Sequence, residues 1–392
     1  MLSDVKRILL VRTDKIGDVT LTTPAIAALR KKLPVAHLVG LASSIGAEIY
    51  RSNPHLNETI ELTEAHKGFV GFFRLLMLIR RQHFDAVVVF QSRFTIAFLL
   101  FLSRIRFRVG PLSKWWSWLF FNRGRRQNRS AVEMHEADYN LQLLRLFEIT
   151  VAGTKERTYL QVQPEAKRSA QRFFQEKGLS NGKKTVAIHP GMAGSALNWP
   201  ESNYSYLGRS LSKHYNIVVT GGLSESALVE RVFQNIAKNQ SYLPDQPVVA
   251  KFIGERGLAE LIGILDQCDG VVAPSTGPMH LAVALGKKVV SVFSPIKVQS
   301  AVRWGPYGVN VGNNLGILPQ DQASVLIPDV NCAEGFHCAL SACIYYPCMP
   351  RIAVEDVETQ LLVLLEGSSV SMVKSSAFMS YEFEDSYGES EL

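Results

Sequence analysis

No run of apolar side chains in this 392-residue chain approaches the ~20 residues that a helix needs to cross a bilayer. The longest run, Phe94 to Leu102, has less than half that length. The first residues, Met1 to Arg7, include an acid and lead into a strand-like segment without a cleavable apolar region. We therefore expect neither a membrane-spanning helix nor a secretory leader, and we expect a cytoplasmic protein.

Cysteine is also scarce, with five residues in the chain. Cys268 stands alone and is predicted to lie in the core. The gaps between Cys332, Cys338, Cys343 and Cys348 are five, four and four residues, unlike the paired short spacing of zinc sites. In a cytoplasmic chain we expect reduced thiols, with a structural metal as the minor alternative. We predict no metal in the functional site and no cofactor.

The glycine signatures of two large enzyme classes are missing. Gly191 and Gly194, which follow a predicted strand, fit neither the Walker loop of ATPases nor the fingerprint of dinucleotide-binding enzymes. ATP hydrolysis and hydride transfer therefore lose support.

Positive charge is present in excess, with a formal net charge of +7, and it is unevenly distributed. Basic and aromatic residues interleave in one stretch: Arg104, Arg106, Arg108, Lys114, Trp115, Trp116, Trp118, Phe120, Phe121, Arg123, Arg125, Arg126 and Arg129. Such a stretch is compatible with a solvated basic face over buried aromatics, with contact to an anionic membrane, or with stacking on single-stranded nucleic acid. No nucleic-acid motif accompanies it, so we predict no nucleic-acid partner.

Short apolar runs alternate with segments of helical spacing along most of the chain. The strand-like runs are 7–12, 35–42, 58–62, 86–90, 185–189, 216–220, 270–273 and 288–293. The segments of helical spacing with two assigned ends are 69–82, 133–147, 165–177, 204–214, 224–238 and 258–266. One further helical segment ends near residue 32, and another begins near residue 276. This alternation predicts parallel sheets with helices on both faces, and the basic-aromatic stretch interrupts it.

The length fits two domains of ordinary size. We predict an α/β fold of two Rossmann-like, doubly wound domains that face a central cleft, at residues 1–160 and 161–366. Ligands of such sheets bind at the carboxyl ends of the strands. Residues 367–392 are rich in serine and acids, and we predict a disordered acidic tail.

Three loops that follow predicted strands carry candidate chemistry. In the segment 273–282, Ser275 or Thr276 is placed to cap a helix, Gly277 permits close backbone approach, and Pro278 suits the first turn. The free N–H groups of such a helix start hold phosphates without a metal. His280 falls within the same turn. A well-capped helix with a buried histidine is the alternative interpretation.

The second loop, 13–18, places Asp18 at the start of the next helix. A carboxylate there is suited to act as a general base, or it only caps the helix. The third loop, 189–200, offers glycines and Ser195 as donors to a diphosphate, or it is an ordinary flexible loop over a packed Trp199.

Together these loops resemble glycosyltransferase family 9, the heptosyltransferase-like enzymes of lipopolysaccharide core assembly. The resemblance extends from the first strand to about Glu366. It includes Met134-His135-Glu136, the run 303–308 and Cys348-Met349. The pair of the Gly17-Asp18 loop and the turn at 275–280 makes it specific.

The resemblance implies the GT-B fold, with an acceptor on the N-terminal half and a nucleotide sugar on the C-terminal half. Asp18 matches the family's general base, which takes the acceptor's proton during a single inverting, metal-independent displacement. The positions predicted to bind the donor are Ser195, Asn198, Glu225, Ser275, Thr276, Gly277, Pro278 and His280. Those predicted to contact the acceptor or a phosphate are Lys15, Gly17 and Arg303.

Two positions depart from the family. Its characterised members carry a lysine just before Trp199-Pro200, where this chain has Leu197 and Asn198, and they often carry aspartate in place of Ser275. ADP-heptose is nevertheless the favoured donor. The expected acceptor is a lipid-linked sugar, such as a lipopolysaccharide core, and we expect peripheral contact with the cytoplasmic face of the inner membrane.

Two other functions stay open. Nucleotide-sugar epimerases also place two such domains around a nucleotide cleft, but they act on the donor sugar without an external acceptor hydroxyl. A non-catalytic nucleotide-sugar-binding relative is the other, because the phosphate-binding positions have changed.

Overall fold

The structure is a computed structural model that describes residues 5–153, 155–192, 194, 196–238, 246–254, 257–308, 322–332 and 338–367. The predicted donor-binding Ser195 and the predicted tail beyond Gly367 lie outside these residues. Within them, no helix is long and apolar enough to span a bilayer.

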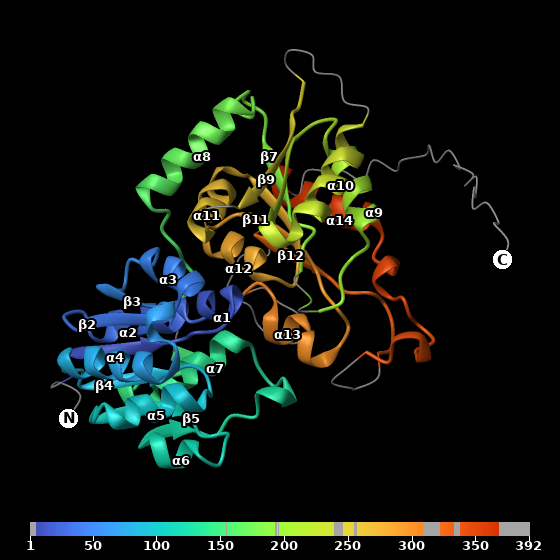
Figure 1. The fold of residues 1–392 in the computed structure, drawn as a ribbon. Coiled ribbons are helices and arrows are strands. Elements are labelled where there is room, and N and C mark those ends of the chain that lie inside the picture. Colours follow the sequence, from blue (N-terminus) through green and yellow to red (C-terminus); the bar gives the residue numbers. More distant parts are fainter. Residues whose placement is uncertain are drawn as a thin grey trace, which may run out of the picture.

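A six-stranded parallel sheet forms the first half of the molecule (Figure 1). Its central strands are short, mainly apolar runs that are buried on both faces. Their order in space is β3-β2-β1-β4-β5-β6, the doubly wound order. In chain order they are β1 (Arg7–Val11), β2 (His37–Ser43), β3 (Glu58–Leu62), β4 (Ala86–Val89), β5 (Phe107–Pro111) and β6 (Arg123–Arg125).

A second six-stranded parallel sheet repeats this arrangement in the other half. Its order is β12-β11-β10-β7-β8-β9, which is the same doubly wound order counted from β7. Its strands are β7 (Thr185–Ile188), β8 (Asn216–Gly222), β9 (Val249–Gly254), β10 (Gly270–Pro274), β11 (Lys288–Val292) and β12 (Ala323–Leu326). Two parallel sheets with flanking helices confirm the predicted fold class. The predicted boundary at residue 160 falls between the sheets and stays a prediction.

Helices flank both sheets. Those of the first half are α1 (Ile16–Thr20), α2 (Thr23–Lys32), α3 (Ser44–Arg51), α4 (Gly68–Arg81), α5 (Phe94–Leu102), α6 (Ser117–Phe120) and α7 (Glu136–Gln142). Those of the second half are α8 (Pro164–Glu176), α9 (Glu201–Leu211), α10 (Ser226–Ala237), α11 (Leu258–Gln267), α12 (Gly277–Ala284), α13 (Ala301–Trp304) and α14 (Val354–Glu366).

The sequence predicts that the basic-aromatic stretch interrupts the alternation of strands and helices. In the structure this stretch is part of the first sheet. It contributes β5 and β6, because the backbone of β5 pairs with β4 and that of β6 continues to the edge. Arg108 packs over the ring of Phe101 and donates to the carbonyls of Ile105 and Phe120, so this arginine belongs to the fold.

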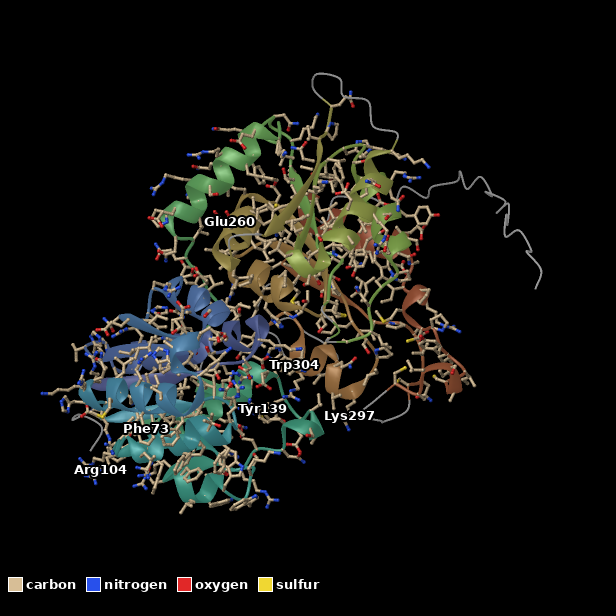
Figure 2. All side chains as sticks on the ribbon, in the orientation of Figure 1. Phe73, Arg104, Tyr139, Glu260, Lys297 and Trp304 are labelled. Atoms are coloured by element: carbon tan, nitrogen blue, oxygen red, sulfur yellow. The ribbon has the colours of Figure 1, made fainter. Side chains whose placement is uncertain are left out.

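The two halves share a hydrophobic core cluster that contains residues of both sheets. Figure 2 shows Tyr139 of α7 and Trp304 of α13 near their junction. Polar contacts cross the same junction: the Tyr307 hydroxyl donates to Asp138 at 2.8 Å, and His135 Nε2 lies 2.9 Å from the carbonyl oxygen of Gly305. Cys268 is buried in the core, as predicted.

Candidate functional site

A cavity of about 640 Å³ lies between the two halves. Segments that follow β1, β4 and β10 form much of its wall, and β1 and β4 are the strands between which the order of the first sheet reverses. The lining residues are Arg12, Asp14, Lys15, Gly17, Asp18, Gln91, Ser92, Arg129, Glu136, Ala196, Ser275, Thr276, Gly277, His280, Val298, Gln299, Arg303 and Trp304. Two of the three predicted loops therefore meet here, and the third contributes Ala196.

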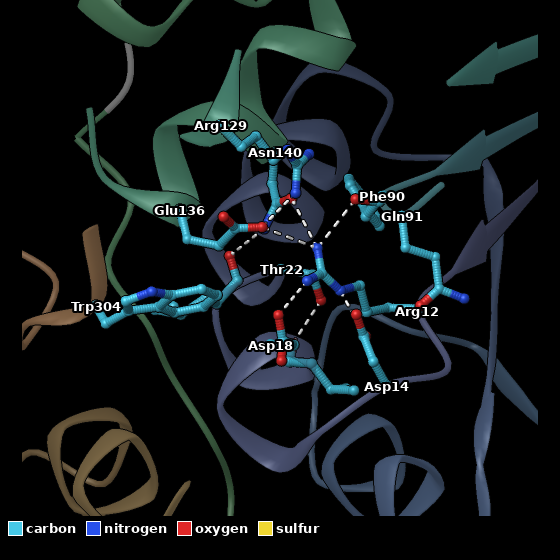
Figure 3. Close-up of polar contacts among 12 residues, drawn as sticks. Arg12, Asp14, Asp18, Thr22, Phe90, Gln91, Arg129, Glu136, Asn140 and Trp304 are labelled. Carbon is cyan, nitrogen blue, oxygen red and sulfur yellow. Dashed lines mark hydrogen bonds and ion pairs between the residues drawn. The ribbon is translucent and has the colours of Figure 1, made fainter. Parts of the chain in front are cut away.

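Asp18 lies inside the first turn of α1, three residues after Lys15, which occupies the N-cap position. Its Oδ1 accepts a short hydrogen bond from Arg12, and Asp14 accepts from the same guanidinium at 2.7 Å (Figure 3). The alternative that Asp18 caps α1 is therefore wrong, since its carboxylate faces Arg12 instead. No residue in the described part of the chain hydrogen-bonds to its Oδ2.

The environment of Asp18 favours its protonated form. Burial raises the pKa of Asp18, and the charge of Arg12 offsets only part of that effect. For Arg12 burial acts in the lowering direction, but the carboxylates of Asp18, Asp14 and Glu136 raise its pKa well above the usual value. Arg12 is therefore permanently charged, and Asp18 is a carboxylate of increased basicity.

Glu136 is fully buried at the start of α7 and connects three arginines, of which Figure 3 labels Arg12 and Arg129. Its Oε1 accepts from Arg12 at 3.2 Å and, at shorter range, from Arg129. Its Oε2 accepts from Arg303 of the second half at 2.9 and 3.0 Å. Burial opposes ionisation of Glu136, but the three guanidinium groups outweigh it and lower its pKa. The charged Glu136 carboxylate therefore links the two halves of the protein at the cavity through its ion pairs.

The start of α12 faces the cavity with its backbone donors uncapped. Thr276 occupies the N-cap position, yet its side chain makes no capping hydrogen bond, and Pro278 falls in the first turn. The expectation that Ser275 or Thr276 caps the helix through its hydroxyl is not met. Ser275, Thr276 and Gly277 line the cavity, so hydroxyls and N–H groups are available to an anion.

Gly17 and Gly277 bring α1 and α12 into direct contact. A Cβ at Gly17 would lie 2.7 Å from Cδ2 of His280, and a Cβ at Gly277 would lie 2.7 Å from Cβ of Ile16. The close approach predicted for Gly277 is therefore an approach between the two halves of the protein. His280 lines the cavity beside Gly17, and burial, with a smaller effect of His135, lowers its pKa to about 3. Its imidazole is neutral near pH 7.

The cations at the cavity differ in their availability. Arg303 is paired with Glu136 and lies over the ring of Trp304, and Arg129 is paired with Glu136. Burial lowers the pKa of Arg129 to about 10. Lys15 is exposed on the cavity wall and forms no ion pair with any described residue. Counted together, four cations and three carboxylates line the cavity, which suits an anionic ligand.

Three predicted donor-binding residues do not line this cavity. Asn198 holds its own loop: its amide donates to the carbonyl of Pro190 at 2.6 Å, and its Oδ1 accepts from Tyr204. The Glu225 carboxylate packs against Gly191 and accepts from the N–H of Gly222 at 3.3 Å. Pro278 is buried within α12.

The sequence did not single out Arg12 or the role of Glu136. Arg12 directly follows an apolar strand run, where a charged side chain is expected to be buried. A buried arginine needs an acidic partner, and this was the one sequence signal for such a pair. Among the described residues, no group of three or more His, Cys, Asp or Glu side chains is arranged to hold a metal ion.

Comparison with known proteins identifies a protein family that this chain matches. A family model described as glycosyltransferase family 9 (heptosyltransferase) matches residues 72–326. A Haemophilus influenzae protein, whose own glycosyltransferase activity is not established, is 30% identical over 309 residues, or 77% of this chain and 86% of that protein. Lipopolysaccharide heptosyltransferase 3 of Escherichia coli is 23% identical over 307 residues, or 75% of this chain and 84% of that protein.

Among solved structures, Escherichia coli ADP-heptose lipopolysaccharide heptosyltransferase II is similar with a TM-score of 0.71 at 20% identity. The match covers 92% of this chain and 98% of that one. This likeness concerns the fold, and the GT-B arrangement expected from the sequence is confirmed.

Proposed function

The chain belongs to glycosyltransferase family 9 and is a glycosyltransferase, and on this premise we propose that it transfers a heptose from ADP-heptose to a lipopolysaccharide-core or other lipid-linked sugar acceptor. The observation that carries the proposal is the cavity, in which the Asp18 carboxylate and the uncapped start of α12 line one space. The Escherichia coli relatives supply the choice of substrates, since their names give lipopolysaccharide and ADP-heptose.

Asp18 is the general base of the proposed reaction. Its carboxylate takes the proton of the acceptor hydroxyl while that oxygen attacks the anomeric carbon of the donor. The bond from this carbon to the diphosphate breaks in the same displacement, its electron pair leaves with the diphosphate, and the anomeric centre is inverted. Burial raises the pKa of Asp18, which makes it a stronger base than an exposed aspartate.

The leaving diphosphate is stabilised by the second half of the molecule. N–H groups at the start of α12 and the hydroxyls of Ser275 and Thr276 face the cavity. Lys15, an exposed residue of the cavity wall, supplies a cation in place of the lysine that the family carries before Trp199. Charge stabilisation of this kind needs no metal.

The lipid anchor of the acceptor places the reaction at a membrane surface, and we assign it to the cytoplasmic face of the inner membrane. The protein would then act as a peripheral enzyme.

Titration of the purified protein with ADP, UDP, GDP and dTDP, followed by calorimetry, tests the donor. A clear preference for ADP supports an ADP-heptose donor. Preference for another nucleotide moves the donor elsewhere within the family. Retained nucleotide binding without turnover on any acceptor favours the non-catalytic alternative, and conversion of the donor without any acceptor identifies an epimerase.

Replacing Asp18 by asparagine tests the base. We expect Asp18→Asn to lower turnover by ~10²-fold or more, the scale of a lost general base, while ADP affinity stays nearly unchanged. Single-turnover rates and calorimetric affinities measured on the same preparation separate the two effects. Unchanged turnover would remove Asp18 from the mechanism.

A further inference from the structure

An unusually large set of apolar side chains is exposed on one side of the first half, over α4, α5 and α6. Phe69 is 80% exposed and Trp115 is 84% exposed. We call this set the α4–α6 face, and its members are Phe69, Val70, Phe73, Met77, Phe94, Phe101, Trp115, Trp118 and Leu119. Contiguous exposed apolar surface of this kind marks an interaction site.

Ring contacts show that this face is continuous across the three helices. The ring centroids of Phe69 and Phe73 in α4 lie 4.9 Å apart. The ring of Phe72 contacts those of Phe73 and of Phe98 in α5. Phe94 of α5 contacts Phe98 and Trp116, next to the exposed Trp115. Phe69, Phe73 and Phe94 are therefore exposed members of one aromatic cluster.

The chain segment that carries the face is strongly positive, although Arg129 within it lines the cavity and Lys67 is paired with Glu64. From Lys67 to Val132 the sequence has one carboxylate, Asp85, and thirteen basic residues. Asp85 is engaged by the backbone N–H groups of Lys6 and Arg7. Figure 2 shows Arg104 and Phe73 on the same side of the first half.

A second copy of the chain is a poor occupant for this face. A twofold interface would bring the same basic residues of both copies together, and their repulsion would oppose association. An anionic bilayer offers the complementary charge, and its interfacial region accepts aromatic side chains and the stems of arginines.

The face adjoins the cavity. Gln91 and Ser92 line the cavity, Arg93 donates to the Thr13 hydroxyl at 3.0 Å, and the exposed Phe94 begins α5 immediately afterwards. A bilayer in contact with the α4–α6 face would lie next to the entrance of the site.

We propose that the α4–α6 face docks on an anionic lipid bilayer, with its exposed aromatic rings inserted at the interface. This inference rests on the proposed function, because a lipid-linked acceptor needs the site at a membrane. It adds the surface that makes the contact, which includes α4, a helix outside the basic-aromatic stretch of the sequence.

Co-sedimentation with phosphatidylcholine vesicles, with and without phosphatidylglycerol, measures the docking. We expect binding to the anionic vesicles that weakens as salt is added. The triple variant Phe69→Ser, Trp115→Ser, Trp118→Ser should lower the partition coefficient by about tenfold or more, because each ring contributes buried apolar area. Replacing Arg81→Gln, Arg104→Asn and Lys114→Gln together should weaken binding and flatten its salt dependence.

The matched control is Val35→Ser with Tyr206→Ser, which removes exposed apolar side chains outside the face. It should bind like the unaltered protein. A second readout needs no variant: brominated phosphatidylglycerol should quench the fluorescence of exposed tryptophans in the unaltered chain.

Absence of binding and quenching, or equal binding by the triple variant and the control, would overturn the proposal. A dimer that the triple variant dissociates, without vesicle binding, would assign the face to a second copy instead. Neither assay uses a sugar donor, so failure of the proposed function would leave both results interpretable.

Discussion

The Arg12 guanidinium sets the properties of Asp18. It donates to both Asp14 and Asp18 and is anchored by Glu136 and the carbonyl of Phe90. A planar guanidinium group that is fixed by several acceptors orients a carboxylate more firmly than a donor with a single hydrogen bond does. Arg12 is therefore a positioning residue, and it also moderates how far burial raises the pKa of Asp18.

Removal of this charge should be visible in the pH dependence of the reaction. The base acts when deprotonated, so kcat/KM falls as pH falls through the pKa of Asp18. In Arg12→Gln a lowering influence on that pKa is lost, and the acidic limb should move to higher pH. Each profile is normalised to its own maximum, so a partly unfolded preparation does not shift it.

The control is Arg93→Gln, which removes a cation that hydrogen-bonds Thr13 rather than Asp18. Its acidic limb should stay where it is in the unaltered protein. An unshifted limb in Arg12→Gln would show that Asp18 is not the group that titrates.

Single residues were predicted from the sequence where a loop pattern marks them. Asp18, Ser275, Thr276 and His280 follow strands, and the sheets bring them to one cavity. The partners of Arg12 could not be predicted, because Glu136 lies 124 positions away and only the packing of α7 brings it near. Asn198 was predicted to bind the donor, but its side chain hydrogen-bonds to Pro190 and Tyr204 and does not line the cavity.

Among the elements, α1 and α12 are the pair whose contact shapes the site. Each carries a glycine at the point of closest approach. In Gly17→Ala the new methyl group would lie 2.7 Å from the His280 ring, and neither helix has room to withdraw from the shared core. We expect the free energy of unfolding to fall by about 1–3 kcal/mol, the usual cost of overpacking.

Urea denaturation of four variants measures this cost: Gly17→Ala, Gly222→Ala, His280→Ala and the double variant Gly17→Ala, His280→Ala. Gly222→Ala is the control, because a Cβ there meets no atom within 4 Å. Gly17→Ala should cost less stability in the background of His280→Ala than in the unaltered protein, since the clashing ring is gone. Equal stability of Gly17→Ala and Gly222→Ala would refute the close contact.

Sequence periodicity located most of the central strands and the edge strand β3, and it missed β5, β6, β9 and β12. β1, β4, β7 and β10 are mainly apolar runs, and they match the expected segments. β6 consists of Arg123, Gly124 and Arg125, all exposed, and an edge strand of this composition has no apolar pattern to detect. α5 was visible only as an apolar run, because one face of it packs on the sheet and the other carries exposed rings.

At the scale of the whole molecule, Glu136 joins the halves through Arg303. In Glu136→Gln three buried or half-buried arginines lose their common carboxylate. We expect a loss of about 3 kcal/mol or more in the free energy of unfolding at pH 7, typical of a buried charge left without its partner. Urea denaturation at several pH values measures it.

The sign of the pH dependence follows from the lowered pKa of Glu136. Its contribution is fully present above the pKa of the unfolded chain, near ~4.3, and is lost as pH falls through the lower folded value. The difference between the unaltered protein and Glu136→Gln should therefore shrink in acid. A constant difference down to low pH would mean that packing, and not charge, accounts for the loss.

The glycine contact between α1 and α12 also constrains how the gene can diverge. Gly17 faces the His280 ring and Gly277 faces Ile16, so two codons in the first half are tied to two in the second. A mutation that enlarges position 17 is tolerated only after one that reduces position 280. In a set of homologous genes these positions should accordingly change in pairs, although they lie far apart in the reading frame.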